Sequence, residues 1–109
     1  MSSEMREPTF VILSSLASGS RHGYGIITDV AALSSGALRL QAGTLYAALD
    51  RLRVDGLVEV SSEDIVQGRL RRSFSLTSLG RTRLAEAAHR RQQGAEIALR
   101  RLNGGVVGA

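Results

Sequence analysis

The fold is decided by one stretch of sequence, which runs Gln41-Ala42-Gly43-Thr44-Leu45-Tyr46-Ala47-Ala48-Leu49-Asp50-Arg51-Leu52-Arg53-Val54-Asp55-Gly56. Four of its apolar residues recur at i, i+3, i+4 and i+7: Leu45, Ala48, Leu49 and Leu52. This spacing predicts an α-helix from Thr44 to Asp55 with one apolar stripe. Gly56 suits the position just after a helix end, because glycine adopts a left-handed backbone without steric cost.

The outer face of this predicted helix begins with small or short polar side chains: Gln41, Ala42, Gly43, Thr44 and Ala47. A purely structural surface helix usually carries long charged side chains there. An uncluttered first turn lets a helix enter a DNA groove and bring short side chains to the base edges. The alternative interpretation, from this helix alone, is an ordinary amphipathic core helix.

Length and composition narrow the class of protein. The chain has 109 residues, which indicates one domain, and it has no cysteine for disulfides or thiolate ligands. It has 14 basic residues, all arginine, against 10 acidic ones, and the resulting formal net charge of +4 favours a polyanionic partner. The sequence has neither a signal-peptide core nor an apolar run of about 18 residues. We therefore expect a cytoplasmic protein that does not bind membranes.

The remaining elements follow in chain order. We expect a first helix from Pro8 to about Ala17 and a second with its apolar residues between Ile26 and Leu33. Residues 38–40 alternate and form either a short strand or an extended link. Residues 57–61 and 70–76 are predicted strands of a hairpin, whose flexible polar tip spans residues 62–69 and is not a tight two-residue turn.

A last helix is predicted from Ser78 to about Leu102, capped by Thr77. Such a helix of about 25 residues spans more than roughly 35 Å. The rest of the domain cannot cover this length, so part of the apolar face of the helix needs another chain. Gly94, within this predicted helix, either allows close approach of a partner helix or bends the helix. The residues assigned to dimerisation are Phe10, Leu84, Ala88, Arg91, Ala95, Ala98 and Leu102.

The order of elements predicts a mostly helical α+β fold, a winged helix-turn-helix with a long C-terminal dimerisation helix. Residues 1–77 form the predicted DNA-binding domain. Residues 78–109 form the dimerisation helix and tail, within one compact unit. No internal repeat or linker divides the chain.

Three segments carry a family resemblance: His22-Gly23-Tyr24-Gly25-Ile26, Gly43-Thr44-Leu45-Tyr46, and Gly68 to Thr77 followed by Gly80. In this order and spacing the chain resembles the PadR family of bacterial transcriptional regulators, over about residues 7–102. The resemblance implies a homodimer that binds a pseudo-palindromic operator, usually as a repressor, and is released by a small molecule or other signal. The short length resembles the subgroup with a single C-terminal helix.

The chain departs from the family pattern at Ala42, where proline is common, and at Ser73, where an aromatic residue is common. Some short members bind flat aromatic compounds between the protomers through tryptophan, and this chain has no tryptophan. We expect any small-molecule effector to act at the dimer interface, because a change in dimer packing changes the separation of the two recognition helices.

The predicted major-groove residues are Gln41, Thr44, Ala47 and Arg51. Arg51 can bond guanine and Ala47 can contact a thymine methyl group. The alternative for Arg51 is a surface ion pair with Asp50 or Asp55.

The predicted backbone contacts lie on both sides of that helix. Four of them come from the helical part of the chain: Arg21, His22, Tyr24 and Tyr46. The other two, Arg69 and Arg71, share one face of the hairpin and suit phosphate or the minor groove. The alternatives are a packed ring for Tyr24 and, for the hairpin, a solvated charged surface in which Arg72 pairs with an acid and Glu63 and Asp64 neutralise the arginines.

Catalytic and metal chemistry find no support in the sequence. His22 and His89 are far apart and lack metal-ligand spacing, so we expect neither a metal nor a cofactor. Gly23 and Gly25 follow no predicted strand, which argues against a dinucleotide loop. No nucleophile–base pair marks an enzyme. The predicted partners are double-stranded DNA and a second copy of the chain. The rival interpretation is a winged-helix protein-interaction module that does not need DNA.

Overall fold

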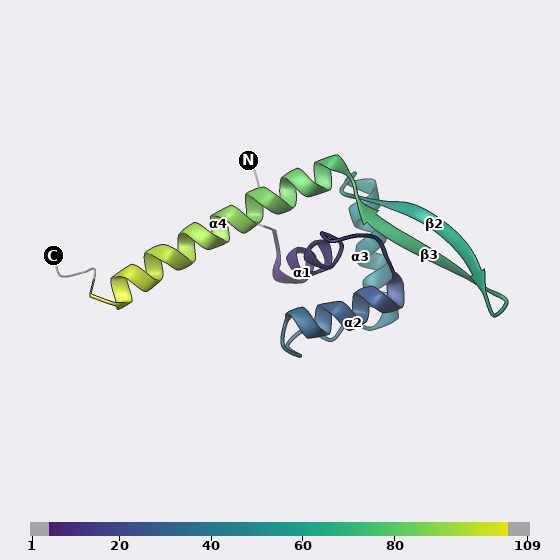
Figure 1. Cartoon of the computed structure of the whole chain (residues 1–109), viewed down its shortest axis with the longest axis horizontal. Helices are drawn as coiled ribbons and strands as arrows, with labels where there is room; N and C mark the ends of the chain where they lie inside the picture. The colour runs from purple at the N-terminus through teal and green to yellow at the C-terminus, as the bar shows by residue number, and fades with distance from the viewer. Residues whose placement is uncertain (1–4, 105–109) are drawn as a thin grey trace.

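The computed structural model describes residues 5–104. The elements, in chain order, are α1 (Glu7–Ser15), β1 (Arg21–His22), α2 (Gly23–Leu33), α3 (Ala42–Val54), β2 (Val58–Val66), β3 (Arg69–Leu76) and α4 (Ser78–Leu102). Figure 1 shows α1, α2 and α3 gathered beside the start of α4, with the β2–β3 hairpin extending away from them. We call this hairpin the wing. The predicted winged helix-turn-helix fold is confirmed, and the predicted helix ends differ from the observed ones by a few residues.

The core lies where α1, α2 and α3 meet the base of the wing. The predicted stripe of α3 faces this core: Leu45 and Leu49 are fully buried and Leu52 is 4% exposed. Ile12 of α1 and Phe74 of β3 belong to the same buried cluster, so residues distant in sequence pack against α3. Burial of one face therefore fixes which face of α3 is left for solvent.

The end of α3 is set by Gly56, whose φ of +78° is left-handed. The Gly56 N–H donates to the Arg53 carbonyl, and the Leu57 N–H donates to the Leu52 carbonyl at 2.9 Å. These two bonds are the Schellman arrangement that satisfies carbonyls at a helix end. They turn the chain directly into β2.

The three strands form an antiparallel sheet in the order β1-β3-β2. Arg21 and His22 were predicted only to lead into α2, but they pair with Phe74 and Ser73 of β3 as β1. Residues 38–40 form no strand, so of the two alternatives the extended link is the one observed.

The predicted flexible tip at residues 62–69 was wrong. The strands continue to Val66 and from Arg69, and only Gln67 and Gly68 connect them, with φ values of 52° and 78°. Two successive left-handed residues make the tight hairpin turn that matches strand twist. The prediction failed because residues 61–72 are exposed on both faces. Such a ladder needs no apolar alternation, and Gln at the first turn position gave no turn signal.

α4 has the bounds predicted for it, and Thr77 caps it by accepting a hydrogen bond from the Gly80 N–H at 2.9 Å. Only its first part packs: Gly80 and Ala87 are buried, whereas residues 88–104 are all exposed. The helix continues through Gly94 and projects from the body in Figure 1, so that the molecule measures 65 by 30 by 21 Å. Within residues 5–104, no helix is both long and apolar enough to span a bilayer.

Candidate nucleic-acid interface

The outer face of α3 is open to solvent. Gln41 precedes the helix as its N-cap, and the side chains of Gln41, Thr44, Ala47 and Arg51 are all exposed. Among the ion pairs of residues 5–104, Asp50 pairs with Arg53 at 3.9 Å and Arg51 takes part in none. The alternative surface ion pair for Arg51 is therefore not formed here. The predicted major-groove residues form one accessible strip along the helix.

An open groove of about 440 Å³ lies between the start of α2, α3 and the tip of the wing. Five residues predicted to contact DNA line it together: His22, Tyr24, Tyr46, Arg69 and Arg71. Gly23, Val66, Gln67 and Leu70 complete its lining. The groove therefore joins the helical and wing parts of the predicted interface.

The two tyrosines of this groove have different settings. Tyr24 is 76% exposed, so the alternative of a packed ring does not describe it. Tyr46 is 45% exposed; its ring lies 6.4 Å from that of Phe74 between centroids. Its hydroxyl rests on Gly23, where no side chain competes for the space. Tyr46 is thus held in place by packing while part of it faces the groove.

Arg21 and His22 have partners inside the protein. The Arg21 Nε donates to the Ser15 carbonyl at 2.7 Å, and its guanidinium pairs with Asp29 at 3.5 Å. The His22 Nδ1 accepts a hydrogen bond from the Gly25 N–H at 3.1 Å and so caps α2. Both residues position the start of α2, and their contact with DNA stays a prediction.

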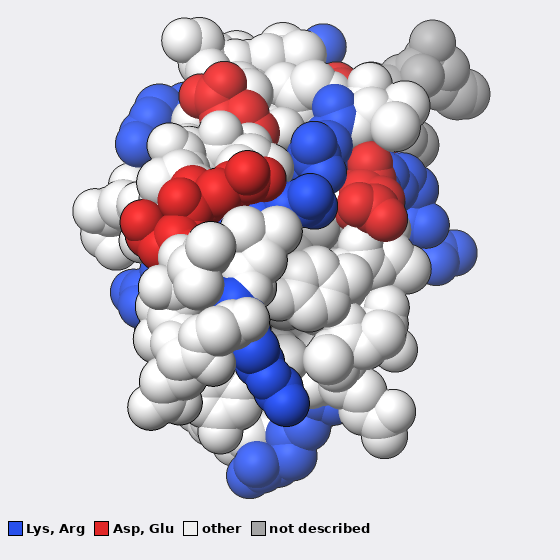
Figure 2. Space-filling view, turned by 90° about the vertical axis from the view of Figure 1, so that its right-hand side faces the viewer, with Lys and Arg blue, Asp and Glu red and all other residues white. Residues whose placement is uncertain are grey.

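The wing carries mixed charge. Arg72 pairs with Glu63 at 2.8 Å, as the alternative for Arg72 expected, and the two face each other across the strands. Asp64 lies opposite Arg71 in the ladder. In Figure 2, acidic residues gather in the upper half of the view, and the lower half shows basic and uncharged residues. The positive surface is therefore local and does not cover the whole face.

The residues assigned to dimerisation do not form one patch within a single chain. Phe10 and Leu84 are half-buried between α1 and α4, while Ala88, Ala95, Ala98 and Leu102 are exposed along the projecting part of α4. Leu99 was not among the residues predicted for dimerisation, although it is 57% exposed and lies three residues before Leu102 on the same side of α4. Leu99 fits the same spacing, four residues after Ala95 and three before Leu102, but the neighbouring Ala98 was assigned in its place.

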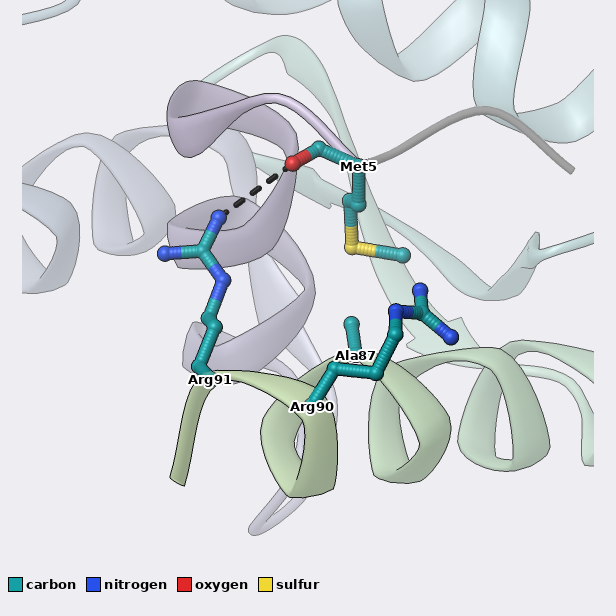
Figure 3. Close-up of a pocket in the computed structure, with 4 residues that line it drawn as sticks. All are labelled: Met5, Ala87, Arg90 and Arg91. Atoms are coloured by element: carbon teal, nitrogen blue, oxygen red, sulfur yellow. Dashed lines mark hydrogen bonds between the residues drawn. The ribbon is translucent and has the colours of Figure 1, made fainter. Parts of the chain in front are cut away.

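Arg91 is held within the chain. Its guanidinium pairs with Glu7, donates to the Met5 carbonyl at 3.2 Å and covers the Phe10 ring at 3.9 Å. Figure 3 shows Arg91 reaching from α4 to the Met5 carbonyl beside a pocket of about 220 Å³ that Met5, Ala87 and Arg90 also line. In this chain Arg91 joins α4 to α1, and its role between protomers stays a prediction.

The sequence pattern of the transcriptional regulator PadR-like family matches residues 12–86, which is more than half of the chain. The chain belongs to the PadR-like family. The resemblance stated from three short segments is thereby confirmed, and family members are regulators of transcription, not enzymes.

Two similar proteins agree with this assignment. The chain is 42% identical over 67 residues to the transcriptional regulator Rv3488 of Mycobacterium tuberculosis, covering 62% of this chain and 49% of that protein. It therefore spans about half the length of that relative. A PadR-like transcription factor from Bacteroides fragilis is 27% identical with a TM-score of 0.69, over 82% of this chain and 84% of the other.

The fold is also that of Bacillus subtilis PadR, whose structure was solved in complex with operator DNA. The two share 22% identity and a TM-score of 0.66, over 75% of this chain and 46% of that one. At this identity the likeness concerns the fold. Among residues 5–104, no three His, Cys, Asp or Glu side chains gather as metal ligands would.

Proposed function

We propose that the chain is a homodimeric, sequence-specific DNA-binding repressor that acts on a pseudo-palindromic operator in the cytoplasm. The observation that carries the proposal is the exposed strip of Thr44, Ala47 and Arg51 on α3, beside a groove lined by Arg69 and Arg71. Short side chains suit base edges, and arginines on either side suit guanine or phosphate. Bacillus subtilis PadR, which has the same fold, was solved in complex with operator DNA, and this supports DNA as the ligand.

Two copies are part of the proposal because operators of this kind have two halves. Two recognition helices dock in successive major grooves when they lie about 34 Å apart. The projecting part of α4 exposes Leu99 and Leu102 at 57% and 79%, which supports its use as the contact between protomers. Compounds that enter this contact would alter the separation of the α3 helices and release the operator.

DNA binding is tested by selecting duplexes from a random library with the purified chain. We expect an enriched pseudo-palindrome, and a steep loss of affinity as salt rises, because phosphate contacts release counterions. The variant Arg51→Gln with Arg71→Gln removes one predicted base contact and one predicted backbone contact. Its affinity should fall by about a hundredfold or more if each contact is worth roughly 1–3 kcal/mol.

The matched control is Arg83→Gln with Arg90→Gln, which removes the same charge from exposed positions on α4. This control should stay within about threefold of the parent, since only long-range attraction changes. Enrichment of no sequence at low salt would overturn the proposal. Normal regulation in cells by the Arg51 and Arg71 variant would instead favour a protein-interaction module built on α4.

A further inference from the structure

One row of residues on α3 lies directly opposite the core. Gly43, Ala47 and Asp50 repeat the i, i+4, i+7 spacing of the buried leucines of α3, two residues earlier in the sequence. Two residues correspond to about 200° of rotation around an α-helix, so this row points away from the core. All three residues are exposed. We call them the central row, and Asp50 is the member whose side chain can form a hydrogen bond.

The carboxylate of Asp50 is accessible and weakly held. Its side chain is 76% exposed, and it pairs with Arg53 at 3.9 Å. An exposed ion pair between residues three apart on a helix adds little to stability, so Arg53 does not fix the carboxylate in place. The oxygens of Asp50 are therefore available to a ligand that approaches the outer face of α3.

The dimensions of a helix and of the major groove decide what Asp50 would face in a DNA complex. An α-helix with its side chains is about 10–12 Å across, and the major groove is about 12 Å wide. A helix that fills the groove places its central row over the base edges and its flanks toward the phosphates. A carboxylate in this position is repelled by the phosphates on both sides, so it is tolerated only where a base donates a hydrogen bond to it.

We propose that Asp50 is a specificity-determining residue that accepts a hydrogen bond from the N4 amino group of a cytosine in each operator half-site. The proposal rests on the DNA-binding function above and deepens it. In the major groove, guanine and thymine present no donor to a carboxylate. Adenine presents its N6 amino group beside the N7 acceptor, which would repel the second carboxylate oxygen. Cytosine presents a donor without a neighbouring acceptor on the same base, so it is the best match for Asp50.

Arg51 complements this choice of base. It follows Asp50 in the chain, is exposed, and takes part in none of the ion pairs of residues 5–104. Arginine donates to O6 and N7 of guanine, and guanine is the partner of cytosine in its base pair. The neighbouring acidic and basic side chains therefore match a C·G pair in one orientation. The reversed pair would set the guanine acceptors against the carboxylate of Asp50.

Asp50 also affects binding to DNA that lacks the operator. At an unrelated sequence its carboxylate finds no donor and keeps only the repulsion from the phosphates. A repulsive group of this kind lowers the affinity for wrong sequences more than for the right one. Replacing Asp50 with a neutral residue should therefore raise the affinity for unrelated duplexes while it lowers the ratio between operator and unrelated DNA.

The test uses the duplex that the parent chain selects from the random library and a set of duplexes in which each base pair is replaced in turn. The parent should show one position in each half-site where cytosine is preferred over thymine by about tenfold. In Asp50→Asn the preference there should move to adenine, because an asparagine amide bonds both N6 and N7. In Asp50→Ala the four bases should become nearly equal at that position. All other positions should keep their preferences.

The matched control is Asp55→Asn, which removes the same charge from the exposed C-cap residue of α3, outside the central row. It should keep the base preference at every position. The variants should unfold thermally as the parent does, because both sites are exposed. If Asp50→Asn raises the affinity for every duplex by the same factor, Asp50 acts only as a charge and the inference is wrong, while the proposed function stands. If the parent chain selects no DNA, the proposed function itself fails.

Discussion

The hydroxyl of Tyr46 on α3 occupies the place that a β-carbon at residue 23 of α2 would take. Gly23 therefore sets how closely α2 and α3 approach beneath the candidate interface. We expect Gly23→Ala to lower the free energy of unfolding by about 1–3 kcal/mol through overpacking, measured by urea denaturation. Away from such a contact, the same change in a helix is usually stabilising by about 0.5–1 kcal/mol.

Two further variants isolate this contact. Gly43→Ala, in the first turn of α3 with open space around it, should be neutral or stabilising. In a Tyr46→Ala background, Gly23→Ala should lose its cost, as a double-mutant cycle would show. Equal effects of Gly23→Ala in both backgrounds would contradict the proposed clash.

Gly80 allows α4 to lie against the backbone at the base of the wing. A β-carbon there would strike the Leu57 carbonyl, which no side-chain rotation can relieve. Gly80→Ala should therefore cost about 2–3 kcal/mol or more in chemical denaturation. Gly94→Ala in the same helix meets no atom within 4 Å and should raise helix stability by about 0.5–1 kcal/mol. A Gly80 variant as stable as the parent would show that the two backbones can separate freely.

Arg91 should anchor α1 to α4. Replacing it with glutamine removes the pair with Glu7, the bond to the Met5 carbonyl and the cation–π contact with Phe10. Because the pair is largely exposed, we expect a loss of only about 1 kcal/mol in thermal or urea unfolding. Arg90→Gln, one residue away in the same pocket, should change stability by less than about 0.5 kcal/mol. Equal losses in both variants would mean that general charge, not the contacts of Arg91, matters.

The proposed dimer predicts a concentration-dependent effect. Leu99→Gln with Leu102→Gln should raise the dimer dissociation constant by about tenfold or more in sedimentation experiments, because two exposed leucines lose their buried contact. Ile97→Gln is the control, since Ile97 is 45% exposed but lies on the other side of the helix from Leu99. A parent chain that is monomeric at all concentrations would refute the dimer.

Much of the fold could be predicted because apolar spacing reports burial. The stripe of Leu45, Leu49 and Leu52 fixed the register of α3, and Thr77 marked the start of α4. The full length of the wing was harder to predict because its outer half buries no side chain. Around Ser62 and Glu63, the two strands pair through their backbones while their side chains are exposed. Periodicity cannot reveal a strand that lacks a buried face.

The candidate site was predictable in part for a similar reason. Exposure of Thr44 and Ala47 follows once the buried face of α3 is known. The partners of Arg21 could not be predicted in this way, since Ser15 and Asp29 approach it only through tertiary packing. The position of Leu70 in the lining of the groove could not be predicted either, because it depends on the exact register of the ladder.

The junction at Thr77 has a mechanical consequence. Its hydroxyl donates to the Gly56 carbonyl at 2.6 Å and its N–H donates to the Leu57 carbonyl at 3.1 Å, directly where α3 has ended. The start of α4 and the end of α3 are thus joined at one corner by these two hydrogen bonds. In the proposed dimer, a second protomer that rotates the far end of α4 should therefore rotate α3 with it as one rigid unit.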